Sequence, residues 1–245
     1  MNAFLNLVPL DWPTTLKRIL GRATELGPSA VLIFDLDSTV FDNRPRQARI
    51  VREYGAAHGL QALTRCQPLH FVSGWSLQAA AEAVGVDAEA YQRFGKDLKR
   101  FWFHRFFTSD YCRDDIEVVG APRYLQALLA TGVRVTYVTG RHEEMREGTL
   151  ACLAKCGMPV PGQAPGVALL MKPTLREDDD AYKHAARLVL EAEGELLAAF
   201  DNEPMHINGY ARHFPGALAV HLATDHSGRP VELEPQVISI PHFAW

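Results

Sequence analysis

The stretch VLIFDLDSTVFDN, near the start of the chain, constrains the fold more than any other part of the sequence. Its four apolar residues, Val31 to Phe34, predict a β-strand that is buried on both faces. Two aspartates, Asp35 and Asp37, follow this strand with only Leu36 between them. Like charges held so close repel and raise each other's pKa, so they need a compensating group nearby. A buried strand that ends in two carboxylates therefore indicates a functional site.

Strands and helices alternate along most of the chain. Apolar runs predict strands at 31–34, 133–138, 167–171, 196–200 and 217–222, and helical spacing predicts helices at 13–26, 122–130, 145–155, 180–193 and 206–213. This alternation predicts a parallel sheet between two layers of helices, a Rossmann-like three-layer α/β/α core. The Pro-interrupted tail PVELEPQVISIPHFAW, residues 230–245, is expected to pack along the surface.

A long helical block interrupts this alternation after the first strand. Residues 44–113 carry Ala-rich and aromatic helical patterns and no clear strand, and the block is too long for a simple connection. We therefore expect residues 1–43 and 114–245 to form the core, and residues 44–113 to form an inserted helical subdomain.

Polar residues follow the ends of the other predicted strands as well. Thr139, Gly140 and Arg141 follow the second strand, Lys172 follows the third, and Asp201, Asn202 and Glu203 follow the fourth. The carboxyl ends of parallel strands meet at one edge of an open sheet, where ligands bind. Asp35, Asp37 and Asp201 would be compatible there if they surrounded a hard cation such as Mg²⁺, which prefers oxygen ligands.

These motifs resemble those of the haloacid dehalogenase-like (HAD) hydrolase superfamily. FDLDST is similar to its first motif, DxDxT, and VTGR is similar to the second. A lysine before the fourth strand and the acidic FDNEP are similar to the third and the fourth. The motifs occur in the family's order and the resemblance covers residues 30–222. It implies a phosphatase-type member with a helical C1-type cap, formed by the insert.

The resemblance also implies a role for each residue. Asp35 would attack phosphorus and form an aspartyl-phosphate, and Asp37 would act as general acid and then as general base. Thr39 would support the turn and contact substrate, and Thr139 would hydrogen-bond the phosphoryl group. The metal Mg²⁺ would be bound by Asp35, by the backbone carbonyl of Asp37, and by Asp201 with Asn202.

Several assignments have two interpretations. The lysine of the third motif is Lys172 or Lys183, and we favour Lys183 because its spacing before Asp201 suits the family better. Many members have a second acid where this chain has Asn202, so metal affinity would be lower unless Glu203 compensates.

The substrate-binding residues are predicted to be Thr39, Gly140, Arg141 and Arg44. Arg44 and Arg46 would reach a second anionic group on the substrate, or would be solvated charges at a hinge. His142 would line the pocket or begin a helix. The aromatic segment Lys99 to Phe107 is expected to pack inside the insert rather than to bind bases.

The overall composition limits the classes of partner. The chain has 245 residues and a net charge of −4, which makes nucleic acid an unlikely partner, and it has no apolar run long enough to span a bilayer. We expect a cytoplasmic protein whose four cysteines are buried thiols, acting on a small phosphorylated metabolite.

The alternatives to this function are a phosphotransferase or mutase with the same nucleophile, a polynucleotide-end phosphatase, and a binding protein with little turnover. The sequence leaves the substrate and the oligomeric state open.

Overall fold

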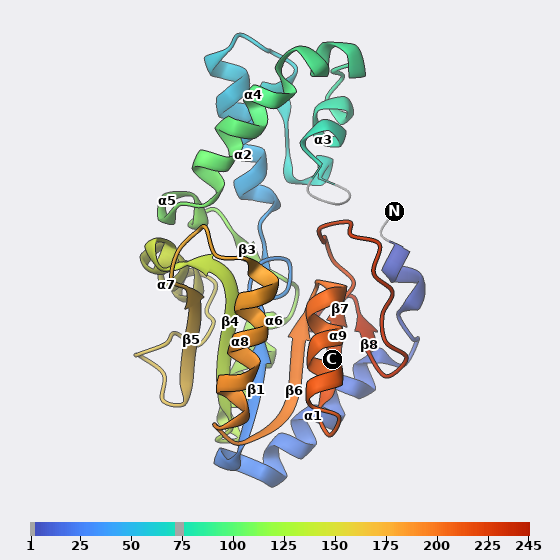
Figure 1. Cartoon of the computed structure of the whole chain (residues 1–245), viewed down its shortest axis with the longest axis vertical. Coiled ribbons are helices and arrows are strands. Elements are labelled where there is room, and N and C mark those ends of the chain that lie inside the picture. The colour runs from blue at the N-terminus through green and yellow to red at the C-terminus, as the bar shows by residue number, and fades with distance from the viewer. Residues whose placement is uncertain (1–2, 72–75) are drawn as a thin grey trace.

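A six-stranded parallel sheet forms the centre of the computed structural model, which describes residues 3–71 and 76–245. The strand order is β5-β4-β1-β6-β7-β8 (Figure 1). The strand bounds are β1 Ala30–Phe34, β4 Arg134–His142, β5 Val167–Lys172, β6 Glu195–Asp201, β7 Leu218–Leu222 and β8 Ile238–Ile240. β1 pairs with β4 on one side and with β6 on the other, so it lies in the middle of the sheet.

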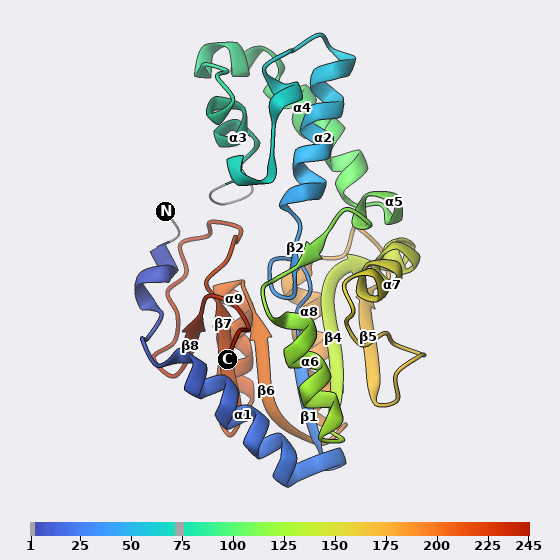
Figure 2. The ribbon, with the colours of Figure 1, turned by 180° about the vertical axis from the view of Figure 1, so that it is seen from behind.

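Helices cover both faces of the sheet. Alternate residues of β1 enter different cores: Leu32 and Phe34 enter one, and Val31 and Ile33 enter the other. The first core is covered by α1 (Trp12–Leu26), α6 (Ala121–Ala130) and α7 (Arg146–Lys155), and the second by α8 (Asp179–Glu191) and α9 (Pro204–His213). Figures 1 and 2 show these two layers from opposite sides. Helices on both faces of the sheet confirm the predicted three-layer α/β/α fold. The strand β1 is apolar at every position, which suits burial between two helical layers.

The C-terminal tail differs from our prediction. We expected it to lie along the surface, but Ile238–Ile240 pairs with β7 as a sixth parallel strand. Ile240 is fully buried, so this short strand contributes to the core. Three residues give too little alternation for a strand to be recognised from the sequence.

The residues between β1 and α6 form a mainly helical body. They contain α2 (Arg44–Ala57), α3 (Leu77–Ala83), α4 (Ala88–Phe106) and α5 (Ser109–Cys112). The helices share a hydrophobic core of their own. Trp102 and Phe106 of the aromatic segment lie in it as expected, whereas Phe103 of the same segment is 44% exposed. Figures 1 and 2 show α2, α3 and α4 beyond the carboxyl ends of the core strands.

Short elements complete the structure. β2 (Phe41–Asp42) and β3 (Ile116–Glu117) form an antiparallel pair where the chain leaves the core and returns to it. Short 3-10 helices occur at Ala3–Leu7, Gly27–Ser29, Leu63–Arg65, Pro68–His70 and Glu143–Met145. None of the helices in the described ranges combines the length and the apolar character needed to cross a membrane. The four cysteines are buried thiols.

His221 joins the added strand β8 to the loop after β6. Its Nε2 lies 3.0 Å from the carbonyl oxygen of Asn202 and its Nδ1 lies 2.9 Å from the hydroxyl of Ser239. Because the carbonyl can only accept, Nε2 carries the hydrogen and Nδ1 accepts from Ser239. Burial lowers the pKa of His221 to about 4, so the imidazole is neutral at pH 7.

We expect this buried histidine to make the protein less stable in mild acid. The native pKa is lowered from 6.5, so the unfolded chain takes up a proton first and stability is lost as the pH falls from 6.5 towards 4. The contribution of His221 should fall by about 2 to 3 kcal/mol between about pH 7.5 and about pH 4.5. Denaturant unfolding of His221→Gln should show a smaller loss than the wild type. His58→Gln, which changes a more exposed histidine, should keep the full loss. Equal acid sensitivity of the wild type and both variants would contradict this role.

Candidate active site

The turn after β1 fixes the positions of the two aspartates. The backbone carbonyl of Leu36 accepts hydrogen bonds from the N–H groups of Thr39, Val40 and Phe41, and the side chain of Leu36 is fully buried. Ser38 has a φ of +59°, in the left-handed region that L residues rarely adopt. Asp35 comes directly after β1, and its N–H donates to Phe200 on β6.

Lys183 joins the first aspartate to the end of β6. Its Nζ donates to Asp35 Oδ1 at 2.5 Å and to Asp201 Oδ2 at 2.7 Å, and all three side chains are buried. Burial raises the pKa of Asp35 to about 7 with help from the charge of Asp201, although the Lys183 ammonium opposes this rise. Burial also favours a neutral Asp201, but Lys183 and His206 outweigh it and hold the pKa of Asp201 below its ordinary value. The buried carboxylates of Asp35 and Asp201 therefore share the ammonium group of Lys183.

Thr39 and Asn202 extend this group. The Thr39 hydroxyl lies 3.1 Å from Asp35 Oδ2 and 3.2 Å from Asn202 Oδ1, and it accepts a hydrogen bond from the backbone N–H of Asn202. The amide nitrogen of Asn202 donates to the carbonyl of Asp225 at 2.6 Å. The Asn202 Oδ1 atom therefore lies beside the Thr39 hydroxyl that Asp35 also contacts, and the amide nitrogen points towards Asp225.

A bulge at the end of β4 orients the residues of the second motif. Thr139 pairs with Met171 and the next pair is His142 with Lys172, so Gly140 and Arg141 are extra residues in this strand. The N–H of Arg141 donates to the Thr139 hydroxyl at 3.2 Å. A Cβ on Gly140 would lie 3.1 Å from the carboxylate of Asp179, so a small residue suits this position.

Asp37 belongs to a second charged group. Arg141 donates to both of its carboxylate oxygens at 2.8 Å, and Arg46 of α2 donates to Oδ1 at 2.5 Å. Asp115 forms ion pairs with the same arginines, at 2.6 Å to Arg141 and 3.0 Å to Arg46. Burial alone would raise the pKa of Asp37, but the two guanidiniums outweigh it and hold that pKa well below its usual range. We call Asp37, Arg46, Asp115 and Arg141 the charged quartet.

The structure leaves three sequence candidates outside these contacts. Arg44 lies on the surface and forms a bidentate pair with Asp42. Lys172 donates to the backbone carbonyl of Glu177 and to Asp179, and only Lys183 contacts Asp35 and Asp201. The Glu203 carboxylate accepts hydrogen bonds from Ser227, so Asn202 offers its oxygen to the Asp35 group and Glu203 does not.

A cavity of about 100 Å³ is lined by many of the predicted residues, although Thr39, Arg44 and Asp201 are not among them. A water molecule occupies roughly 30 Å³ in the liquid, so this space suits a group the size of a phosphate. Sequence reasoning missed Phe106, Phe107, Met145, Asp179 and His206, which line it with Asp35, Asp37, Thr139, Gly140, Arg141, Lys183, Asn202 and Glu203. Although burial opposes it, Asp201 and Asp180 hold the pKa of His206 above its ordinary value.

The donor set fits a hard divalent cation. Asp35, Asp201 and Asn202 present carboxylate and amide oxygens, and the backbone carbonyl of Asp37 is near in sequence. Two buried carboxylates plus waters are a typical Mg²⁺ environment. Within the described ranges, no three His, Cys, Asp or Glu side chains converge into a metal cluster. A cation at this place would take amide, backbone and water oxygens besides the carboxylates of Asp35 and Asp201.

Known structures share this fold. No protein-family model matches the sequence, and no curated protein matches it. CbbY from Rhodobacter sphaeroides, in complex with phosphate, superposes with a TM-score of 0.52 at 15% identity over 88% of this chain and 95% of its own. A putative phosphatase from Clostridium difficile gives 0.51 at 13% identity over 87% and 94%. A putative haloacid dehalogenase-like hydrolase from Burkholderia xenovorans gives 0.50 at 14% identity over 88% and 94%.

These similarities show the fold alone. The chain has the Rossmann-like fold of the haloacid dehalogenase-like hydrolases, as the resemblance of its motifs implied. At the carboxyl edge of its sheet it combines a buried carboxylate pair, a shared lysine and a phosphate-sized cavity.

Proposed function

We propose that this protein is a Mg²⁺-dependent phosphatase that hydrolyses a small phosphomonoester through an aspartyl-phosphate on Asp35. One observation carries the proposal: Lys183 bridges Asp35 and Asp201 beside a cavity of about 100 Å³ at the carboxyl edge of the sheet. A bound Mg²⁺ would be held by Asp35, Asp201, Asn202 and the backbone carbonyl of Asp37, and would neutralise phosphate charge.

The residues divide the reaction into two displacements. A carboxylate oxygen of Asp35 attacks phosphorus, the bond to the ester oxygen breaks, and Asp37 gives its proton to the departing alcohol. Asp37 then takes a proton from water, which attacks the same phosphorus and releases phosphate and free Asp35. The Thr139 hydroxyl and the Lys183 ammonium hold the remaining phosphoryl oxygens.

Asp37 needs to change its contacts during this cycle. As a general acid it must carry a proton, and the arginines of the charged quartet favour its ionised form. We infer that Asp37 turns from Arg46 and Arg141 towards the leaving oxygen when substrate binds. The structure described above would then be the resting arrangement.

The helical insert would serve as the cap. Phe106 and Phe107 come from its longest helix and the residue after it, and both line the cavity that contains Asp35. Under this proposal residues 1–43 and 114–245 form the catalytic core, and residues 44–113 form a cap that excludes water and selects small substrates. Buried thiols suit the reducing cytoplasm, where we place the protein.

Hydrolysis of p-nitrophenyl phosphate tests the proposal. Activity should require Mg²⁺, fall by about 100-fold or more with EDTA and return when Mg²⁺ is added in excess, because the ion neutralises charge on the transferring group. Mg²⁺ should also raise the midpoint of thermal unfolding for the wild type but not for Asp201→Asn, since the ion binds only the native site. Full activity in EDTA, or a thermal shift that survives Asp201→Asn, would refute the metal site.

A further inference from the structure

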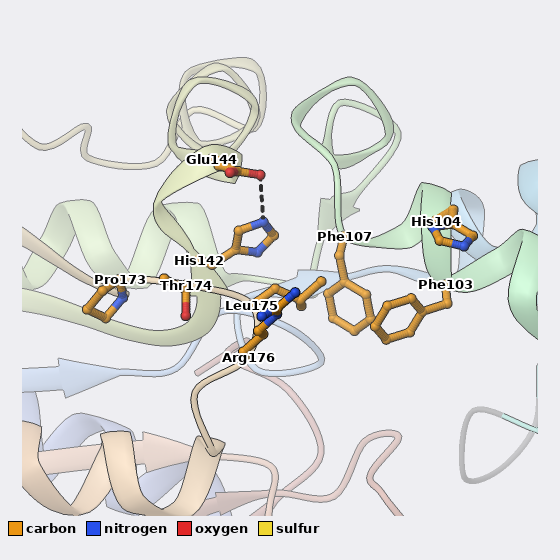
Figure 3. A pocket seen from close by; sticks show the side chains of 9 residues that line it. All are labelled: Phe103, His104, Phe107, His142, Glu144, Pro173, Thr174, Leu175 and Arg176. Atoms are coloured by element: carbon orange, nitrogen blue, oxygen red, sulfur yellow. Dashed lines mark ion pairs between the residues drawn. The ribbon is translucent and has the colours of Figure 1, made fainter.

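A second, larger cavity lies beside the phosphate-sized one. It has a volume of about 440 Å³, within the usual range for small-molecule sites. We call it the aromatic pocket, and it lies between α4 and two segments of the core (Figure 3). Its lining residues are Phe103, His104, Phe107, His142, Glu144, Pro173, Thr174, Leu175 and Arg176.

The two cavities are adjacent on the cap side of the core. Phe107 lines both of them, and His142 of the aromatic pocket follows Arg141 of the smaller cavity directly in sequence. Ser109 holds the end of the insert against the core at this place, because its hydroxyl donates to the backbone carbonyl of Glu144 at 2.9 Å. A group attached to a phosphate beside Asp35 would therefore extend into the aromatic pocket.

One wall of the pocket offers aromatic rings. The rings of Phe103 and Phe107 lie 5.1 Å apart at an angle of 61°, and Figure 3 shows them side by side facing the Leu175–Arg176 segment. Phe103 is 44% exposed, although its neighbour Trp102 is buried in the core of the insert. An exposed ring in a concave site gains free energy when a flat apolar partner covers it.

The opposite wall offers an unused hydrogen-bond acceptor. His142 is only 3% exposed, and within the described ranges its Nδ1 has no hydrogen-bond partner. Its Nε2 lies 3.5 Å from the Glu144 carboxylate, which favours a hydrogen on Nε2 and leaves Nδ1 as an acceptor. A buried acceptor without a partner is costly, so a ligand that donates an N–H or O–H here would be stabilised.

Arg176 gives the pocket a positively charged hydrogen-bond donor. Arg176 is exposed, and no carboxylate in the described part of the chain forms an ion pair with it. Its guanidinium can donate to an acceptor oxygen at the edge of a ring, or stack on the face of that ring.

We propose that the aromatic pocket binds the leaving group of the substrate, and that this group is a flat heteroaromatic ring bearing a hydrogen-bond donor. The inference rests on the proposed phosphatase function. The ring lies against Phe103 and Phe107, its donor meets Nδ1 of His142, and an acceptor on its edge meets Arg176. Aliphatic polyol phosphates can donate a hydroxyl to Nδ1, but they offer no flat face to the aromatic wall.

The test compares kcat/KM for three esters. Pyridoxal 5′-phosphate and uridine 5′-monophosphate carry heteroaromatic rings on a short and a long link, and glycerol 2-phosphate carries none. At least one ring ester should exceed glycerol 2-phosphate by about tenfold or more, in line with the free energy of contacts with the aromatic wall. The preferred ring ester then shows which link length the pocket takes. Equal or better hydrolysis of glycerol 2-phosphate would overturn the proposal.

Variants separate recognition from folding. Phe103→Leu should lower kcat/KM for the preferred ring ester about three- to tenfold and leave that for glycerol 2-phosphate unchanged. His142→Phe should lower kcat/KM for the ring ester by a similar factor. Phe94→Leu changes a phenylalanine of the same helix away from the pocket and should leave both unchanged. Equal losses for both esters in Phe103→Leu would show that Phe103 acts only on structure, and no loss for the ring ester in His142→Phe would refute the contact with Nδ1.

Binding is measured apart from turnover. Isothermal titration calorimetry of the wild type with pyridoxal and with uridine, the rings without phosphate, should show binding of at least one that weakens in Phe103→Leu. If no ester is hydrolysed but a ring binds in this way, the phosphatase proposal fails and the pocket stands. If esters are hydrolysed and neither ring binds, the pocket proposal fails alone.

Discussion

Replacement of Asp35 by asparagine is expected to abolish phosphomonoester hydrolysis, with kcat lowered by roughly 10⁴-fold or more. The introduced amide would keep the shape of the side chain, but it is a poor nucleophile towards phosphorus. Lys183 would keep its 2.7 Å contact with Asp201, so the fold should survive. Rates with p-nitrophenyl phosphate at saturating Mg²⁺ give the measurement, and thermal unfolding confirms that the variant is folded.

A neighbouring aspartate provides the control. Asp42 lies in the same segment, pairs with Arg44 and does not line the cavity. Asp42→Asn should therefore retain kcat within about twofold, since surface pairs contribute little. Rapid quenching of the wild type in acid, followed by mass spectrometry of peptides, should find the phosphoryl group on Asp35. Turnover by Asp35→Asn, or a phosphoryl group on another residue, would refute the nucleophile.

The strand-end residues could be predicted because their signals are local. An apolar run defines each strand, and topology alone brings the ends of parallel strands to one edge. In the structure Asp35, Asp201 and Asn202 lie close together at that edge. Lys183 contacts Asp35 and Asp201, and the Thr39 hydroxyl lies next to Asn202. Spacing before Asp201 already favoured Lys183 over Lys172. In the structure Lys183 of α8 contacts Asp35, whereas Lys172, the last residue of β5, contacts Asp179.

The partners of Asp37 could not be predicted from strand ends. Arg46 comes from the start of the insert and Asp115 from the core just after it, so their meeting depends on how the insert packs on the core. One signal was present: Arg46, Ile50 and Tyr54 recur every four residues and lie on the buried face of α2. A charge within an apolar stripe indicates a buried ion pair. Arg44 lies off that stripe, which explains its exposure.

The largest expected loss of stability comes from Arg46→Met. The charged quartet balances two guanidiniums against two carboxylates in a site where Arg46 and Asp115 are fully buried. Methionine keeps most of the side-chain volume but leaves Asp37 and Asp115 with Arg141 alone. Breaking a buried pair in this way costs about 3 to 5 kcal/mol, because a carboxylate loses its compensating charge. For a chain of this size the melting temperature should fall by roughly 10 °C.

A matched control on the same helix separates burial from charge. Arg49 of α2 is about one-third exposed and pairs with Glu53 at 2.8 Å and Asp114 at 3.0 Å. Because solvent screens these pairs, Arg49→Met should cost less than about 1 kcal/mol. Denaturant unfolding of the two variants compares their free energies directly. Equal costs would show that Arg46 acts through packing alone.

Restoring the charge balance should restore stability. In Arg46→Met with Asp115→Asn, one guanidinium faces one carboxylate, so the double variant should be more stable than Arg46→Met by about 1 to 3 kcal/mol. This non-additivity distinguishes a charge effect from loss of volume, and the double variant keeps the comparison possible if Arg46→Met does not fold. Asp115→Asn making Arg46→Met still less stable would contradict the quartet. Because Arg46 belongs to the proposed cap and Asp37 is the proposed general acid, the ion pairs that hold the cap in place would also hold Asp37 away from the leaving oxygen.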